Sequence, residues 1–469
     1  MATPGVYLMG SISNIWPVGL LVLSAACSRK PEPLPSPPAP TRAHTETAPK
    51  PLKNADSKPQ EATAAAKAPA RTPLNVILIT IDSLRADMPW TGYARPIAPF
   101  LTELAQSSVV YERAYSLSSY TSKSVSSLLT GRYPSTLYRS GSFFASFSPA
   151  NVFFTEALQA HKIRTIGWHG HMYFGKDKGL NQGFDEWQIV PGITFNSETD
   201  EHVTSDKMTA LGIQLLTKPE NTSGQFFAWA HYMDPHDKYI KHPESPDFGR
   251  NNRGRYDSEV YYTDSYLKKF FDWCKTQPWF EHTAIIVSAD HGEAFGEHEM
   301  YKHAFELWDV LTHVPLIIKV PGVPPKRILA RRSILDLAPT ILDLMDCPAP
   351  TSFMGKSLVP EISGEAPPEE RPYILLELPE DSHNAPRRAI IKGAFKLYSR
   401  DDSHQLSLYN LDKDPGETVD LAEKDPKTKT ELKALLDQAY AAIPRVEPFG
   451  GMALRTGRRA AGPTGPTAR

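Results

Sequence analysis

Short apolar runs alternate with helical patterns along most of the chain. Five of these runs are typical of buried strands, at residues 75–80, 163–168, 226–231, 284–288 and 316–320. Strands that alternate with helices indicate a parallel or mostly parallel sheet with helices on both faces, so the pattern predicts an α/β fold. Four shorter runs follow, at residues 373–378, 388–391, 396–398 and 407–410, and they predict a small sheet in a C-terminal α+β subdomain.

The composition excludes several classes of protein. Of the 469 residues, 41% are hydrophobic and 22% are charged, which rules out wholesale disorder and a polytopic membrane protein. The 51 Lys and Arg residues nearly balance the 53 Asp and Glu residues, so the net charge of -2 provides no basic field for a nucleic acid. The three cysteines, an odd number, cannot form a disulfide framework.

Residues 1–27 predict an export signal. An uncharged apolar run at residues 15–26 ends in Leu23-Ser24-Ala25-Ala26-Cys27, which looks like a bacterial lipoprotein signal. Such a run of about 12 residues is too short to span a bilayer, and small residues before a cysteine suit cleavage and acylation. We therefore expect an exported protein in the periplasm or cell envelope, held at the membrane by a lipid on Cys27. The alternative is a buried N-terminal helix with an incidental cysteine.

The rest of the chain divides by composition. Residues 28–73 carry eleven prolines and no aromatic residue, so they predict a disordered tether. The Gly-, Pro- and Arg-rich tail at 445–469 is also expected to be unstructured. Between them we expect a catalytic domain at 74–345 and the C-terminal subdomain at 346–444.

Metal-binding and anion-binding side chains follow four of the predicted strands. They are Asp82 after the first, His169 and His171 after the second, Asp234 and His236 after the third, and Asp290 and His291 after the fourth. In open α/β sheets the ligand site lies at the carboxyl ends of the strands. The sequence therefore predicts a site at this edge of the sheet.

Asp82, Asp290 and His291 are the candidate metal ligands. A carboxylate directly after a buried strand is costly to desolvate unless it is paired or binds a cation. The structural alternative for Asp82 is the N-cap of a helix that begins at Leu84. Asp and His together offer ligands for Zn²⁺, Mn²⁺ or Ca²⁺, so we expect one divalent metal ion.

Thr121 is the candidate nucleophile. Val125, Leu128 and Leu129 share one face of a predicted helix that Gly131 ends, and Thr121 lies at the expected N-cap. Read structurally, Thr121 only caps this helix. Read functionally, its hydroxyl lies at the positive end of the helix, where an anion is favoured. A cation held by the three ligands would lower the pKa of the hydroxyl and make it a nucleophile.

Four segments together resemble the sulfatases of the alkaline phosphatase superfamily. They are residues 75–87, 121–134, 226–236 and 288–322, and they occur in the order that this family has. The resemblance implies an alkaline-phosphatase-like fold. It also implies that Asp82 is the first metal ligand, that Asp290 and His291 are the later metal pair, and that Thr121 is both the nucleophile and a ligand of the metal.

The sequence departs from the sulfatase pattern at the nucleophile and at one metal ligand. Sulfatases carry a Cys or Ser that becomes formylglycine, followed by a Pro and an Arg, and these positions are Thr121, Lys123 and Val125 here. Ser83 replaces a second Asp ligand. The remaining metal site is similar to that of the phosphoethanolamine and phosphoglycerol transferases of the superfamily, which use a metal-bound Thr. We therefore expect displacement at phosphorus or sulfur by a threonine alkoxide.

The resemblance also implies residues that bind the anion. His236 matches a substrate-binding His, His303 lies near an active-site Lys or His, and Lys302 is a neighbour that could take over its role. Lys123 is a further candidate, with a solvated surface lysine as the alternative. A second metal, held by Asp234, His236 and His303, is also possible in principle.

Three functions are compatible with these residues. The first is a metal-dependent hydrolase of an anionic sulfate or phosphate ester. The second is a transferase that passes the phosphoryl group to an envelope lipid or glycan. The third is an inactive relative that serves as a binding module, motivated by the departures at Ser83, Lys123 and Val125. The loops at 143–154 and 191–206 are expected to shape the pocket.

Overall fold

The computed structural model describes residues 73–194, 202–401 and 404–450. The predicted signal at 1–27, the tether up to residue 72 and the tail from residue 451 lie outside these residues. Within the described part of the chain, no helix combines the length and the apolar character that crossing a membrane requires.

A mixed sheet forms the centre of the main domain. In the described residues it has nine strands, in the order β10-β2-β9-β6-β1-β5-β3-β4, and β11 pairs with β2. Their bounds are β1 (Asn75–Ile81), β2 (Val109–Tyr115), β3 (Arg164–His169), β4 (Glu186–Ile189), β5 (Phe226–Tyr232), β6 (Thr283–Ala289), β9 (His313–Lys319), β10 (Lys326–Ile328) and β11 (Arg332–Ser333). Only β9 pairs antiparallel, with both β2 and β6. The prediction of a mostly parallel sheet is thus confirmed.

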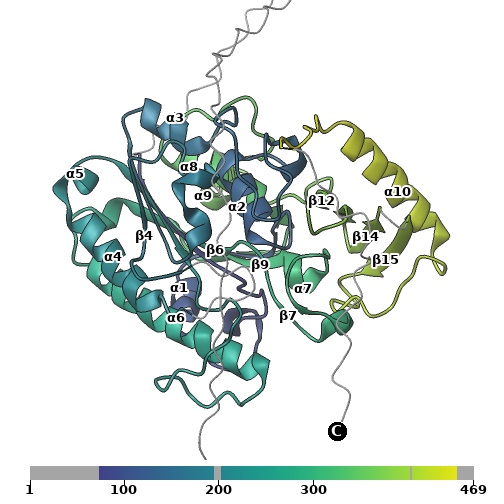
Figure 1. Ribbon diagram of the computed structural model, residues 1–469, viewed down its shortest axis with the longest axis horizontal. Helices are drawn as coiled ribbons and strands as arrows, with labels where there is room; N and C mark the ends of the chain where they lie inside the picture. The colour runs from purple at the N-terminus through teal and green to yellow at the C-terminus, as the bar shows by residue number, and fades with distance from the viewer. Residues whose placement is uncertain (1–72, 195–201, 402–403, 451–469) are drawn as a thin grey trace, which may run out of the picture. The chain divides into compact units, whose positions relative to one another are not determined.

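Helices cover both faces of this sheet, as Figure 1 shows. One face carries α1 (Pro99–Gln106), α4 (Ser205–Thr217) and α6 (Asn252–Cys274), and the other carries α2 (Thr121–Thr130), α3 (Phe154–Ala160) and α8 (Leu337–Leu344). Because both faces are covered, every residue of β1 is buried, which explains its continuous apolar sequence. The short elements are α5 (Pro219–Thr222), α7 (Asp309–Thr312), α9 (Val359–Ser363) and the hairpin strands β7 (Ala294–Phe295) and β8 (Tyr301–Lys302).

The predicted C-terminal sheet is also confirmed. Strands β12 (Ile374–Leu378), β13 (Arg387–Lys392), β14 (Phe395–Arg400) and β15 (Gln405–Asn410) pair antiparallel in that order, and α10 (Pro426–Ala441) follows them. The apolar side chains alternate between two faces. Leu375 and Leu397 pack with Leu436 of α10, whereas Leu376 and Tyr398 pack against the main domain. The sheet is therefore buried on both sides.

The first residues of the predicted tail are ordered on the main domain. The backbone N–H of Val446 donates to Ser135 O, and that of Phe449 donates to Arg139 O. The expectation of an unstructured tail from residue 445 therefore fails for residues 445–450, because these backbone bonds hold the segment against a loop. Composition alone does not show such pairing.

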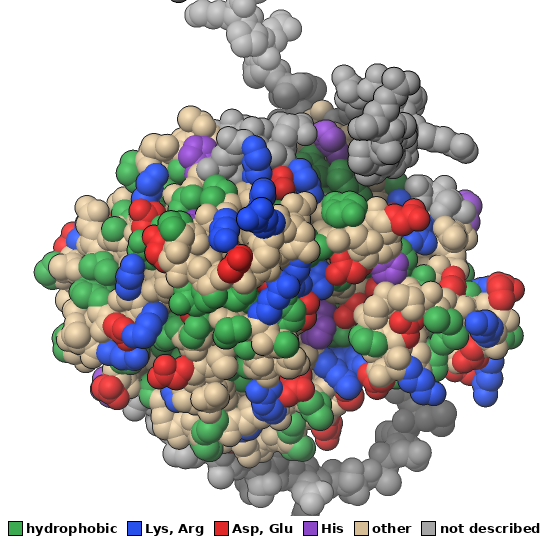
Figure 2. Space-filling model, turned by 90° about the horizontal axis from the view of Figure 1, so that it is seen from below, with side chains coloured by type: hydrophobic (Ala, Val, Ile, Leu, Met, Phe, Trp, Pro, Cys, Tyr) green, Lys and Arg blue, Asp and Glu red, His purple; other side chains and the backbone are tan. Residues whose placement is uncertain are grey.

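Charges of both signs are interspersed on the surface. On the face drawn in Figure 2, Lys and Arg side chains alternate with Asp and Glu side chains. Among the described side chains on that face there is no continuous basic stripe of the kind that follows a phosphate backbone. This agrees with the near-zero net charge of the sequence.

His313, at the start of β9, is a half-buried charged group outside the cleft described below. Its Nδ1 lies 3.3 Å from Asp309 Oδ2, and its Nε2 lies 2.8 Å from Glu112 O. Only the protonated ring can donate to both acceptors. Burial opposes this charge, but the hydrogen bond and the charge of Asp309 outweigh burial and raise the pKa of His313.

We expect His313 to make stability depend on pH. Because its pKa is raised in the folded state, its contribution to the free energy of unfolding is complete below the unfolded pKa of about 6.5 and disappears as the pH rises through the folded pKa. Urea unfolding of wild type and His313→Gln should therefore differ more at acidic than at alkaline pH. A difference that stays constant across this range would contradict the assignment.

Candidate active site

A cleft of about 430 Å³ opens at the carboxyl ends of the central strands. Asp82 follows β1, Met233 and His236 follow β5, and Thr121 begins α2. A second cavity, of about 360 Å³, lies beside Thr283 at the opposite end of β6, and it contains none of the predicted site residues. The chemistry that the sequence predicts therefore belongs to the first cleft.

The structure brings Asp82, Thr121, Asp290 and His291 together. Thr121 Oγ1 lies 3.1 Å from Asp82 Oδ2 and 3.3 Å from His291 Nε2. One ligand atom each of Asp82, Asp290 and His291 lies within 4.8 Å of the others. All three ligand side chains are fully buried. Strands β1 and β6 are adjacent and parallel, so residues that follow them meet at one point.

This group of side chains fits a divalent cation. Asp290 Oδ2 is buried and has no hydrogen-bond partner. Burial and the charge of Asp82 raise the pKa of Asp290 to about 7. Burial also opposes the charge of Asp82, but the hydrogen bond from His231 and the neighbouring His residues hold its pKa well below the usual value. Two buried carboxylates, one with an unsatisfied oxygen, are stabilised by a cation between them.

His291 presents an electron pair to this group. Its Nδ1 lies 3.0 Å from Gly292 O, and a carbonyl only accepts, so Nδ1 carries the proton. Burial is the largest effect and lowers the pKa of His291 to about 4. The neutral ring therefore directs an unprotonated Nε2 toward Asp82 and Thr121, which is the form that binds a metal.

A chain of hydrogen bonds fixes Asp82. Trp229 Nε1 donates to Thr80 Oγ1 at 2.9 Å, and Thr80 Oγ1 lies 2.7 Å from His231 Nδ1. A carboxylate only accepts, so the other nitrogen of the ring, Nε2, donates to Asp82 Oδ2 at 3.2 Å. His231 therefore orients the candidate ligand rather than binding a metal, a role that the sequence did not distinguish.

Two predictions of helix N-caps, at Thr121 and at Asp82, are wrong. Thr121 is the first residue of α2, and its N-cap is Tyr120, although Gly131 ends the helix in the left-handed region as expected. No described helix begins at Leu84, so the N-cap alternative for Asp82 is wrong. Instead, Ser83 has a φ of 58° and turns the chain sharply after β1, with its hydroxyl donating to Asp82 Oδ1 at 2.8 Å.

His236, Lys302 and His303 line the cleft beside this group. The centroid of the His303 ring lies 4.3 Å from the centroid of the His291 ring and 4.9 Å from that of the His236 ring. Its Nδ1 lies 3.2 Å from Glu293 Oε1. Burial and the charge of His236 lower the pKa of His303 to about 3, so its ring is neutral and acts through hydrogen bonds. Lys302 Nζ pairs with Asp237 at 2.8 Å.

Lys123 lies beneath the cleft instead of lining it. Its side chain is fully buried, so the alternative of a solvated surface lysine is wrong. Nζ lies 3.2 Å from Asp381 Oδ2, which also accepts the Tyr120 hydroxyl at 2.6 Å. Burial is the largest effect and lowers the pKa of Lys123 to about 8. Asp381 belongs to the C-terminal subdomain, and so this pair joins the subdomain to the first turn of α2.

The remaining predicted ligands do not form a second metal site. Asp234 accepts hydrogen bonds from the backbone of Thr204 and Ser205, and it thereby holds the start of α4. Among the described residues, Asp234, His236 and His303 do not form a cluster of close ligand atoms. His169 is buried among aromatic rings, and burial lowers its pKa well below the usual value. His171 lines the cleft, and its Nδ1 accepts from Tyr173 N at 3.0 Å.

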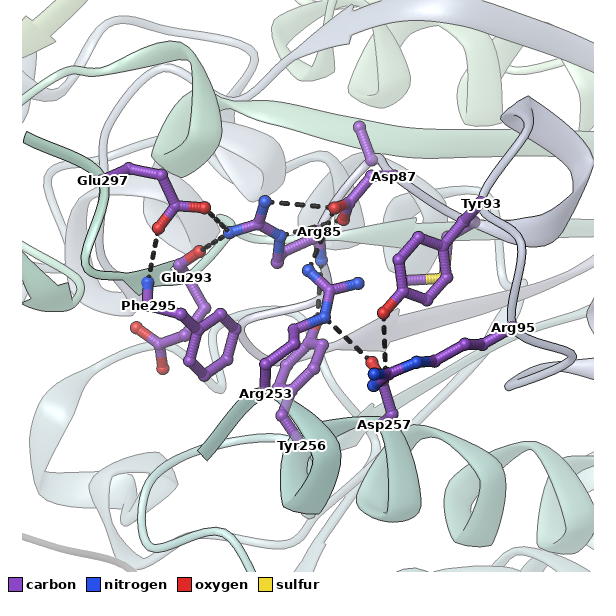
Figure 3. A network of polar contacts seen from close by, with 12 residues as sticks. Arg85, Asp87, Tyr93, Arg95, Arg253, Tyr256, Asp257, Glu293, Phe295 and Glu297 are labelled. Carbon is purple, nitrogen blue, oxygen red and sulfur yellow. Dashed lines mark hydrogen bonds and ion pairs between the residues drawn. The ribbon is translucent and has the colours of Figure 1, made fainter. Parts of the chain in front are cut away.

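An ion-pair network supports the loops that leave β1 and β6. Figure 3 shows Arg85 directed at Asp87, at Glu297 and at the carbonyl group of Glu293, while the Glu293 carboxylate points away. Arg253 of α6 lies 2.9 Å from Asp87. The network leaves the Glu293 side chain available for His303.

Neither Glu293 nor Asp381 was predicted as a site residue. Glu293 could have been found from its place beside Asp290-His291, but no local pattern marks Asp381.

Comparison with known proteins identifies the family. The family description "Sulfatase" matches residues 74–347, more than half of the chain. The chain belongs to the sulfatase family. Residues 296–442 also match the description "N-sulphoglucosamine sulphohydrolase, C-terminal".

The matched segments cover only part of the curated relatives. The Delta 4,5-hexuronate-2-O-sulfatase of Bacteroides thetaiotaomicron is 32% identical over 183 residues, which are 37% of this chain and 37% of the relative. The choline-sulfatase of Rhizobium meliloti is 30% identical over 199 residues, which are 41% of this chain and 38% of the relative. This sulfatase-family chain thus spans less than half the length of the relatives that it matches.

Solved structures share the fold. A 2-O GAG sulfatase superposes with a TM-score of 0.68 at 20% identity, over 79% of this chain and 92% of that chain. The phosphonate monoester hydrolase of Agrobacterium radiobacter has a TM-score of 0.64 at 18% identity, over 78% of this chain and 95% of that chain. The recognition of an alkaline-phosphatase-like sulfatase fold is confirmed.

Removing the Lys123 charge should destabilise the protein. We expect Lys123→Met to lower the free energy of unfolding by about 3–5 kcal/mol, because Asp381 is then left as an unpaired buried charge. Urea unfolding followed by Trp fluorescence measures this loss. The double variant Lys123→Met, Asp381→Asn should recover part of it, and Lys433→Met, which breaks a surface pair with Asp437 on α10, should change little. An equally small effect for Lys123→Met would contradict the buried pair.

Proposed function

We propose that the protein is a metal-dependent hydrolase that cleaves a sulfate or phosphate ester with Thr121 as the nucleophile. The observation that carries this proposal is the position of Thr121 Oγ1, within 3.3 Å of both Asp82 Oδ2 and His291 Nε2. A hydroxyl beside two candidate metal ligands, at the floor of a cleft, has the surroundings of an activated nucleophile. Membership of the sulfatase family supports the class of reaction.

Asp82, Asp290, His291 and the hydroxyl of Thr121 would hold the metal. When bound, a divalent ion supplies a Lewis acid that lowers the pKa of a coordinated hydroxyl and neutralises charge on the ester oxygens. Carboxylate and imidazole ligands suit Ca²⁺, Zn²⁺ or Mn²⁺. His231 keeps Asp82 in the binding orientation through its Nε2 proton.

The side chains of this protein account for the rest of the reaction. Thr121 Oγ1 forms a bond to the sulfur or phosphorus, the bond from that atom to the leaving oxygen breaks, and the Thr121 proton passes to water in the cleft. His236 and His303 face the cleft beside this point, where their ring nitrogens bind ester oxygens, and His236 gives a proton to the leaving oxygen. Water then releases the group from Thr121. An acceptor hydroxyl in place of water would make the enzyme a transferase.

The nucleophile differs chemically from that of other sulfatases. Formylglycine is an aldehyde made from Cys or Ser, and the β-methyl group of threonine prevents this conversion. Lys123 occupies the position of the family proline and has a different structural task, since it pairs with Asp381. The protein is therefore expected to act without modification of residue 121.

We expect one metal ion per chain. After treatment with EDTA, titration calorimetry with Mn²⁺ and with Ca²⁺ should give a stoichiometry of one, and Asp290→Asn should weaken binding by about 10²-fold because it removes a charged ligand. Asp234→Asn is the matched control and should leave stoichiometry and affinity unchanged. Two ions in wild type and one in Asp234→Asn would restore the two-metal alternative. No binding by wild type would refute the metal site.

Replacement of the nucleophile should abolish turnover. We expect Thr121→Ala to lower kcat on 4-nitrophenyl sulfate or 4-nitrophenyl phosphate by about 10³-fold or more, with Thr121→Ser retaining part of the activity. Mass spectrometry of quenched wild type should find sulfate or phosphate on Thr121. If wild type turns over neither ester with added metal and Thr121 stays unmodified, the protein is a binding module and not a hydrolase.

A further inference from the structure

Large apolar side chains are exposed around the mouth of the cleft. Phe305, which lines the cleft, is 48% exposed, and Met172, which lies between two residues that line it, is 39% exposed. The rings of Phe305, Phe143, Phe144 and Tyr173 follow one another with centroids 6.4, 5.1 and 5.5 Å apart. We call Met172, Phe143, Phe144 and Phe305 the apolar rim. Contiguous apolar side chains in solvent mark a contact surface.

Phe305 is held in the apolar rim by an unfavourable backbone conformation. Its φ is 61° and that of Ala304 is 68°, in the left-handed region that bulky residues rarely adopt. Core packing does not account for this conformation, because about half of the side chain is exposed. Strain of this kind persists where the surrounding structure imposes it, and it concentrates at functional sites.

The C-terminal subdomain imposes this conformation. Asn384 Oδ1 accepts the backbone N–H of Phe305 at 3.0 Å, and Ser382 Oγ accepts that of Phe143 at 3.0 Å. One short loop therefore holds both rings at the mouth of the cleft.

Phe449 presents a further ring to solvent beside the apolar rim. Its backbone N–H donates to Arg139 O at 2.9 Å, and it forms a parallel bridge with Ser140. Ser140 precedes Phe143 by three residues, a separation of at most about 11 Å. The Phe449 side chain is nevertheless 46% exposed. A second aromatic ring is thus fixed through its backbone and left in solvent near the cleft.

The segment that contains Phe449 is basic. Residues 445–469 contain five Arg and one Glu, a net charge of +4 in a chain whose total is -2. Beside the apolar rim, the carboxylates of Asp237 and Asp177 are compensated by Lys302 and Lys178, at 2.8 and 3.1 Å. Exposed aromatic side chains next to several Arg residues are typical of surfaces that contact anionic lipid headgroups.

From these observations we infer that the apolar rim and the basic segment 445–469 form a docking surface for an anionic lipid bilayer, with Phe305 and Phe449 entering the headgroup region. A dissolved polyanion would pair with the Arg residues but leave the apolar rim exposed. A two-fold contact between copies would set the basic segments against each other, and like charges repel. The inference depends neither on hydrolysis at Thr121 nor on a lipid at Cys27.

Environment-sensitive labels at single positions test the contact. In the full chain with Cys27→Ser, the fluorophore NBD is attached at Phe305→Cys or Phe449→Cys, because Cys274 and Cys347 are buried. Vesicles of phosphatidylcholine and phosphatidylglycerol in equal parts should shift the emission at both positions to shorter wavelength. A label at Lys275→Cys is the matched control and should not respond, since Lys275 is exposed at the second cavity, at the opposite end of β6.

The charge of the segment is tested on the chain labelled at residue 449. One variant neutralises three of its residues, Arg455→Gln, Arg458→Gln and Arg459→Gln. It should raise the vesicle concentration at the midpoint of the signal about tenfold or more, because each Arg near an anionic surface contributes to binding. The charge-matched control replaces three exposed residues at the end of α6, Lys268→Gln, Lys269→Gln and Lys275→Gln, and should leave the midpoint unchanged.

Several results would overturn the docking surface. They are an unchanged emission at either rim position, an equal shift at residue 275, an equal response to pure phosphatidylcholine vesicles, and an unchanged midpoint in the triple Arg variant. A shift at residue 449 that grows with protein concentration in the absence of vesicles would identify a contact between copies instead. Because no turnover is measured, a failure of the proposed hydrolysis would leave these results as they stand.

Discussion

The placement of two carboxylates side by side in the protein interior is the constraint on which the site depends. Asp82 and Asp290 are fully buried, and they meet because β1 and β6 are adjacent, parallel and end at the same level. Ligand oxygens of the two carboxylates lie within 4.8 Å of each other, and like charges this close repel strongly where the dielectric constant is low. The fold therefore has to supply compensation. It does so with His231, with the backbone N–H of Ser83 on Asp290, and with a position suited to a cation.

The C-terminal subdomain takes part in the site as well as in the fold. Its sheet buries one face against the main domain, and the loop after β12 reaches the first turn of α2. Asp381 contacts Tyr120 and Lys123, immediately on either side of Thr121 and Ser122. Its neighbour Asn384 holds Phe305. A single loop thus supports both the floor and the rim of the cleft.

Much of this arrangement could be predicted from the sequence, and the exceptions have a common cause. Strand periodicity and the position of Asp82, Asp290 and His291 after buried runs were sufficient to predict the sheet and the edge at which these three side chains meet. The alternative for Lys123 failed because its partner, Asp381, lies far along the chain in another subdomain. The role of His231 depends on a hydrogen bond to Thr80 across two strands. Such contacts between distant segments follow from tertiary packing and leave no local pattern.

The dependence of Phe143 and Phe305 on one loop of the C-terminal subdomain has a consequence for how the family diversifies. The candidate metal ligands follow β1 and β6, whereas the loop at 381–384 is carried by a separate antiparallel sheet. Insertions or replacements in that loop would reshape the mouth of the cleft while the reacting atoms keep their places. The side chains that shape the mouth of the cleft and the candidate metal ligands at its floor are thus encoded in different stretches of the gene, and each set is open to change without the other.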